Sequence, residues 1–103
     1  MARSAQAIHE ECDYATVDVS ANITAVYDGP ALLYGVCVNT VLSAQVLPLT
    51  DGSGGAAVVS LAASSAVGTY VKFPGIHFST GLYVDPNDAA TGSVTVFYRP
   101  YNV

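Results

Sequence analysis

Short runs of alternating apolar and polar residues, separated by turn-forming residues, limit the fold of this chain more than any other feature. In the run 14–20, Ala15, Val17 and Val19 alternate with Thr, Asp and Ser, which is the period of a half-buried strand. Gly, Pro, Asn and Asp interrupt such runs about every 8–12 residues. We expect about eight strands from the runs 14–20, 23–27, 31–38, 41–49, 57–62, 69–73, 76–78, 82–84 and 93–101.

Many short strands without a convincing helix after residue 13 predict an all-β fold. This pattern is typical of an antiparallel β-sandwich or barrel. A jelly roll is the most natural arrangement of about eight short strands. An immunoglobulin-like sandwich is the second choice, because the chain has no Trp for the Cys–Trp–Cys core of those domains. With 103 residues in total, we expect one sandwich domain over 14–103.

Residues 1–13 differ from the rest and are expected to form an N-terminal arm. Ala5, Ile8 and Cys12 recur at helical spacing, but isolated helices shorter than about 12–15 residues are marginal. Two interpretations remain open: a disordered tail, or an extended or short helical arm that orders against a neighbouring subunit. The segment lacks the apolar stretch of a signal peptide, so we expect synthesis in a cytoplasm.

Two of the runs allow finer predictions. The run 31–38 is apolar on both faces, which predicts a central strand that is covered on both sides. Within it we expect Cys37 to be a small core residue. Pro48 cannot donate a ladder hydrogen bond, so it predicts that the end of the run 41–49 lies at a sheet edge. Strict alternation in 31–38 would place Leu32, Tyr34, Val36 and Val38 on one face and Ala31, Leu33, Gly35 and Cys37 on the other.

Charged residues are scarce. They make up 11% of the chain, whereas ordinary soluble domains have about 25%. One interpretation is a surface of uncharged polar residues. The other is that much of the surface is buried against copies of the chain or against a partner, because interface cores are depleted in charge. We favour the second interpretation.

The charge balance argues against nucleic acid as a partner, and the length of the apolar runs argues against a membrane-spanning helix. The net charge is −5, and Arg3, Lys72 and Arg99 are isolated from one another. Nucleic-acid binding needs clustered basic residues, so we expect no direct contact with DNA or RNA. No apolar run approaches the length of about 20 residues that spans a bilayer as a helix.

Few residues carry catalytic or metal-binding chemistry. His9 and Cys12 have a zinc-like spacing but no second pair of ligands nearby. We interpret His77 as an outward or partly buried strand residue, and 85–88 as a turn capped by its own side chains rather than a calcium loop. The glycine-rich segment 52–55 lacks the Lys and the helix of a phosphate-binding loop. We therefore expect no catalytic residue, no metal, no cofactor and no enzymatic activity.

Three segments together are similar to a known class of proteins. The succession of strand and turn residues in Gly29–Asn39, Leu49–Gly55 and Phe73–Val84 resembles that of small β-sandwich virion proteins of tailed bacteriophages. The resemblance covers roughly residues 26–99. Such domains serve as capsid decoration (cement) proteins, commonly trimers, or as modules of head or tail fibres. The resemblance implies a structural protein on the capsid exterior, with itself, as a homotrimer, and the major capsid protein as partners.

The resemblance leads to two hypotheses about contacts. In a decoration protein, the N-terminal arm would attach to the capsid shell through Arg3 and Ile8, and the copies would join through apolar strand faces. Tyrosine is enriched at interfaces. The alternative is a fibre or receptor-binding module whose tyrosines recognise host glycans. The residues that we expect at the subunit interface are Tyr34, Tyr83, Phe97 and Tyr98.

Overall fold

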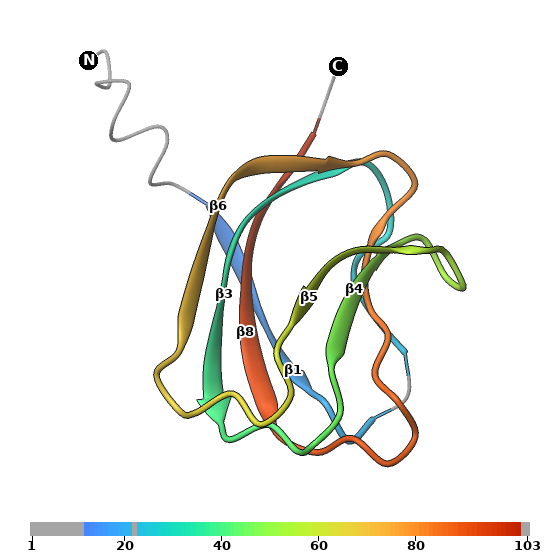
Figure 1. Cartoon of the computed structure of the whole chain (residues 1–103). Coiled ribbons are helices and arrows are strands. Elements are labelled where there is room, and N and C mark those ends of the chain that lie inside the picture. The colour runs from blue at the N-terminus through green and yellow to red at the C-terminus, as the bar shows by residue number, and fades with distance from the viewer. Residues whose placement is uncertain (1–11, 22, 102–103) are drawn as a thin grey trace, which may run out of the picture.

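The computed structural model of the chain describes residues 12–21 and 23–101, and these residues form eight β-strands and no helix. The strands make two antiparallel four-stranded sheets that face each other (Figure 1). Sheet A has the strand order β1-β8-β3-β6 and sheet B has the order β2-β7-β4-β5. The strands are β1 (Asp13–Asp18), β2 (Thr24–Tyr27), β3 (Ala31–Thr40), β4 (Leu47–Asp51), β5 (Ala57–Leu61), β6 (Tyr70–Phe78), β7 (Leu82–Val84) and β8 (Ser93–Pro100).

The strand pairing is that of a jelly roll. The first strand pairs with the last, β2 pairs with β7, β3 with β6, and β4 with β5. The chain is thus one long hairpin whose successive strand pairs alternate between the two sheets. The prediction of an all-β, jelly-roll-like antiparallel sandwich is confirmed.

The hydrophobic core lies between the two sheets. On β8, Val94 and Val96 are fully buried, and Tyr98 continues the same face at the margin of the core, as the alternation predicts. Sheet B contributes the buried side chains of its central strands, β4 and β7. The large side chains with the least exposure are Phe78, Leu33, Leu47, Leu49 and Leu82.

The central strand β3 does not follow the strict alternation that the sequence predicts. Leu33 and Val36 are both buried, so two residues rather than one lie between consecutive inward positions. The register shows the cause: Leu33 is opposite Tyr98, and Gly35 is opposite Phe97, so β3 has one residue more than β8 here. This β-bulge inverts the phase of the strand.

Two expectations for β3 are corrected by this bulge. Val36 and Val38 share the inner face with Leu33 rather than opposing it, and Tyr34 and Gly35 both lie on the outer side. Cys37, in phase with Gly35, is half-buried on the outer side and is not a core residue. The central position of the strand, between β8 and β6, is as predicted.

Strand β6 merges two runs that the sequence suggested were separate. The runs 69–73 and 76–78 belong to one strand, and Pro74 and Gly75 form a bulge where the register passes from Lys72 to Ile76. Gly75 has a φ of 97°, which a residue with a side chain rarely adopts. Because β6 is an edge strand, Pro74 is tolerated. Figure 1 shows β3 and β6 bending together over the top of the molecule.

The predicted strand 41–49 is wrong in its first half, and so is the prediction for Pro48. Strand β4 begins only at Leu47, and it lies between β7 and β5 rather than at an edge. Pro48 is tolerated because it precedes the first β4–β7 register pair, Leu49 with Val84. Its carbonyl oxygen accepts a hydrogen bond of 3.1 Å from the Asp85 amide just beyond that pair.

Replacement of the largest buried side chain should test the core directly. Phe78 on β6 has no exposed surface, so Phe78→Ala should lower the free energy of unfolding by about 3–5 kcal/mol. Urea denaturation followed by circular dichroism measures this value. Tyr14→Ala is the matched control because Tyr14 is mostly exposed, and it should change stability by less than about 1 kcal/mol. Equal losses in the two variants would contradict the proposed core.

Candidate functional site: an aromatic face on sheet A

Aromatic side chains from all four strands gather on the outer side of sheet A. Tyr14 on β1 is the register partner of Phe97 on β8, and Phe97 is the partner of Gly35 on β3. The ring of Tyr70 on β6 meets the ring of Phe97 edge to face, with 6.0 Å between centroids. We call Tyr14, Tyr34, Tyr70 and Phe97 the aromatic face.

Two glycines give these rings their positions. A Cβ atom on Gly35 would lie 2.8 Å from the hydroxyl oxygen of Tyr70, and one on Gly75 would lie 3.2 Å from the ring of Tyr34. Because neither glycine has a side chain, each tyrosine ring covers bare backbone of the sheet. Two rings of the face remain open to solvent, since Tyr14 is 70% exposed and Tyr70 is 54% exposed, whereas Tyr34 and Phe97 are half-buried.

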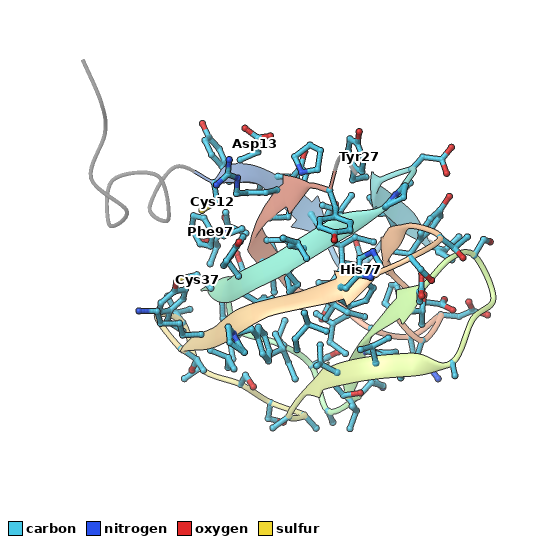
Figure 2. All side chains as sticks on the ribbon, turned by 90° about the horizontal axis from the view of Figure 1, so that it is seen from above. Cys12, Asp13, Tyr27, Cys37, His77 and Phe97 are labelled. Atoms are coloured by element: carbon cyan, nitrogen blue, oxygen red, sulfur yellow. The ribbon has the colours of Figure 1, made fainter. Side chains whose placement is uncertain are left out.

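The border of the aromatic face is polar and mostly uncharged. The Asn39 side-chain amide donates a 2.6 Å hydrogen bond to the Thr95 hydroxyl, and the Ser93 hydroxyl donates one of 2.9 Å to the Thr40 hydroxyl. Lys72, the register partner of Gly35, adds a cation. Figure 2 shows Phe97 and Cys37 on the same side of sheet A.

Only two of the four residues predicted at the interface belong to this face. Tyr34 and Phe97 do, whereas Tyr83 lies on β7 in sheet B. The Tyr83 hydroxyl donates a 3.2 Å hydrogen bond to Asp28. Burial and the negative charge of Asp28 raise the pKa of Tyr83.

Tyr98 faces the opposite direction from Phe97. It packs against the core, with its ring centroid 5.9 Å from that of Tyr27. Burial, followed by the charge of Asp13, raises the pKa of Tyr98. The four predicted residues therefore do not form a single surface.

Tyr14 and Tyr70 are the members of the aromatic face that sequence reasoning missed. A signal for them existed, because strand alternation places Tyr14 in phase with Thr16, and Tyr70 in phase with Lys72, on the polar side of each strand. An aromatic residue on the polar side of a strand is a candidate for a contact surface.

Asp51 at the end of β4 has a structural role. Burial raises the pKa of its carboxylate, but the hydrogen bonds that it accepts outweigh burial and lower the pKa below the ordinary range. Asp18 also has a lowered pKa, because its carboxylate accepts hydrogen bonds from Ser20. The donors to Asp51 are the Ser79 amide at 3.1 Å, the Ser79 hydroxyl at 2.9 Å, the Thr80 amide at 2.8 Å and the Gly81 amide at 3.2 Å.

The other candidate catalytic or ligand-binding segments are part of strands and turns. His77 is exposed on β6 and its ring lies 4.6 Å from that of Tyr101. The turn 85–88 is capped by the Asn87 side chain, which accepts a 2.9 Å hydrogen bond from the Ala89 amide. Segment 52–55 belongs to the turn between β4 and β5, as predicted.

Three further predictions concern a metal site, a membrane span and the N-terminal arm. Within 12–21 and 23–101, no cluster of three or more His, Cys, Asp or Glu side chains could hold a metal ion. No helix that could cross a membrane occurs in the same ranges. His9 and the predicted capsid-contact residues Arg3 and Ile8 lie outside the described residues, so the arm remains a prediction.

The aromatic face combines features suited to binding another macromolecular surface. It offers exposed aromatic area, a hydroxyl-rich border and two cations, Lys72 and Arg99, the latter in phase with Phe97 on β8. Aromatic anchors contribute much of the energy at protein interfaces. Comparisons with protein-family models, with curated proteins and with solved structures return no match.

The pH dependence of stability should reveal the role of Asp51. Because folding lowers the pKa of Asp51, its contribution is present above its unfolded pKa of about 4 and is lost as the pH falls through the folded value. Asp51→Asn should cost about 1–2 kcal/mol at pH 7. Urea denaturation at pH 7 and at about pH 3 should show a smaller difference between variant and wild type at the lower pH.

Asp88→Asn is the matched control, since Asp88 is exposed in the turn after β7. It should leave stability at pH 7 unchanged within about 0.5 kcal/mol. An Asp51→Asn loss of equal size at both pH values would show that the carboxylate charge is not what holds the β6–β7 turn.

Proposed function

We propose that this chain is a non-enzymatic structural protein that self-associates through the aromatic face and decorates a bacteriophage capsid. The observation that carries the proposal is the aromatic face itself: four rings from four adjacent strands, two of them lying over glycine backbone. An interface can use such rings as preorganised anchors, and the exposed rings of Tyr14 and Tyr70 are available for one.

The distribution of charge supports self-association. Strands β3, β6 and β8, which carry Tyr34, Tyr70 and Phe97, have no acidic residue. The acidic residues of sheet A, Asp13 and Asp18, lie on its edge strand β1. Copies of an acidic protein repel one another least where their surfaces carry no acidic side chains.

The capsid role rests on the resemblance in sequence and on the architecture. Jelly rolls occur in viral capsid proteins, although the fold alone does not determine function. In this proposal, three copies join at the aromatic faces, and Arg3 and Ile8 contact the major capsid protein on the exterior of the virion. Each copy contributes a weak contact, and linking the copies raises their combined affinity for the capsid shell.

A second candidate function is glycan recognition by a fibre or receptor-binding module. The observation that favours it is the exposure of Tyr14 and Tyr70 on one face, close to the Asn39–Thr95 hydrogen bond. Exposed rings can stack on sugars, and neighbouring amide and hydroxyl groups can bind their hydroxyls. Jelly rolls also occur in lectin domains.

Removal of rings from the aromatic face should dissociate the oligomer. The double variant Tyr70→Ala/Phe97→Ala should weaken self-association at least tenfold, which corresponds to about 1.4 kcal/mol. Sedimentation velocity over a concentration series measures this, with circular dichroism to verify folding. Tyr83→Ala removes a ring from sheet B and is the matched control, which should associate like the wild type. A wild type that is monomeric throughout would overturn self-association.

Particle composition should separate the two candidate functions. If the chain decorates capsids, purified particles encoded by the same genome contain it in many copies, and purified protein rebinds to stripped shells. Absence from the particles, together with glycan-array binding that Tyr14→Ala abolishes, would replace the capsid role with glycan recognition.

A further inference from the structure

The sequence contains two Asp-Gly pairs, and the structure places them in opposite surroundings. Asp28 and Gly29 lie in the turn between β2 and β3, whereas Asp51 and Gly52 lie at the end of β4. In such a pair the backbone nitrogen of the glycine is held next to the carboxyl carbon of the aspartate, and no side chain on the glycine blocks its approach. The two pairs therefore show what the fold does to the same intramolecular reaction.

Both reacting groups of the Asp51–Gly52 pair are occupied. The Asp51 carboxylate accepts the hydrogen bonds from the β6–β7 turn that are described above. The Gly52 amide donates a 2.9 Å hydrogen bond to the Gly81 carbonyl, and Gly52 is buried. Attack by this amide must first break these bonds, which the folded state protects from opening.

The reacting groups of the Asp28–Gly29 pair are more accessible. Asp28 is exposed, and from the residues that the structure describes its carboxylate accepts a single hydrogen bond, of 3.2 Å, from the Tyr83 hydroxyl. Within 12–21 and 23–101 the Gly29 amide donates no hydrogen bond. The nitrogen and the carboxyl carbon of this pair can therefore meet without unfolding of a strand.

The geometry of the turn keeps a glycine at position 29. Gly29 has a φ of 155°, which residues with a side chain rarely adopt, and a Cβ atom here would lie 3.2 Å from the ring of Tyr27. A larger residue would slow the attack on Asp28, but it would also strain the turn. The reactive pair is thus a consequence of how β2 is connected to β3.

We propose that Asp28 is a site of spontaneous isomerisation to isoaspartate in the folded protein. The Gly29 nitrogen forms a bond to the Asp28 Cγ atom, and one carboxyl oxygen leaves as water with the amide proton and a proton from solvent. The product is a cyclic succinimide. Water then opens the ring at either carbonyl: opening at Cγ restores aspartate, and opening at the backbone carbonyl gives isoaspartate. No oxidant, reductant or enzyme is required.

Isomerisation changes the connection between the two sheets. In the isoaspartyl form the main chain runs through the Cβ atom of residue 28, so the link from β2 in sheet B to β3 in sheet A is one atom longer. The change lies just before Ala31, which is fully buried, and beside the Pro30 carbonyl, which accepts a 2.9 Å hydrogen bond from the Tyr101 amide. An ageing preparation therefore becomes a mixture of two covalent forms.

Peptide mapping after incubation of the whole protein at neutral pH in water labelled with heavy oxygen tests the proposal. Digestion at mildly acidic pH limits isomerisation during preparation, and electron-transfer fragmentation distinguishes isoaspartate from aspartate. In the folded protein, isoaspartate with one heavy oxygen should form at position 28 at least tenfold faster than at position 51, a difference of about 1.4 kcal/mol in activation free energy. In urea the two rates should become similar, because the hydrogen bonds around Asp51 and Gly52 are lost.

Asp28→Glu is the control variant, because its ring would be larger and should not form at a measurable rate. The side chain is exposed, so the variant should fold, and circular dichroism verifies this. Three results would overturn the proposal: no isoaspartate at position 28 in the folded protein, equal rates at positions 28 and 51 in the folded protein, or a product at position 28 that contains no heavy oxygen.

Discussion

The extra residue that β3 has opposite β8 between Leu33 and Gly35 is the constraint on which the two faces of sheet A depend. Without it, the inward set that begins with Ala31 and Leu33 would continue through Gly35 and Cys37, and the core would lose Val36 and Val38. With it, four apolar side chains of the central strand reach the core. Gly35 moves to the outer side, where Tyr34 lies with or without the bulge. The bulge in β6 lies beside it, and the two strands bend together.

The same bulge prepares the outer surface. Gly35 turns outward and its bare backbone is covered by Tyr70, while Gly75 in the neighbouring bulge is covered by Tyr34. The bulge that brings Val36 and Val38 into the core therefore also makes room for the ring of Tyr70 on the opposite face of the sheet. The acidic residues are unevenly distributed: apart from the internally bonded Asp51, they lie outside residues 29–84, and those of sheet A lie on its edge strand β1.

The sequence predicted the jelly roll well because period-two alternation and turn residues are local signals, and the run 93–101 shows both clearly. The bulge in β3 could not be predicted, because this strand has large apolar or aromatic side chains on both faces, among them Leu32, Leu33 and Val36. Only the pairing with β8 determines which of them point into the core. The prediction from Pro48 was wrong because a proline fits in a central strand where the neighbouring strand has ended, and β7 ends opposite Leu49. The aromatic face was half predicted: Tyr34 and Phe97 were chosen, but the seating of Tyr70 on Gly35 joins residues far apart in the sequence.

Hydroxyl-radical footprinting of the assembled protein tests the central claim, that copies meet through the aromatic face. Oxidation of each tyrosine and phenylalanine, read by mass spectrometry, reports its exposure to solvent. The account predicts that Tyr14, Tyr70 and Phe97 become protected as the protein concentration rises into the assembled range, while Tyr83 on sheet B keeps its reactivity. Unchanged oxidation of Tyr14 and Tyr70 in a demonstrated oligomer, or protection centred on Tyr83, would contradict it.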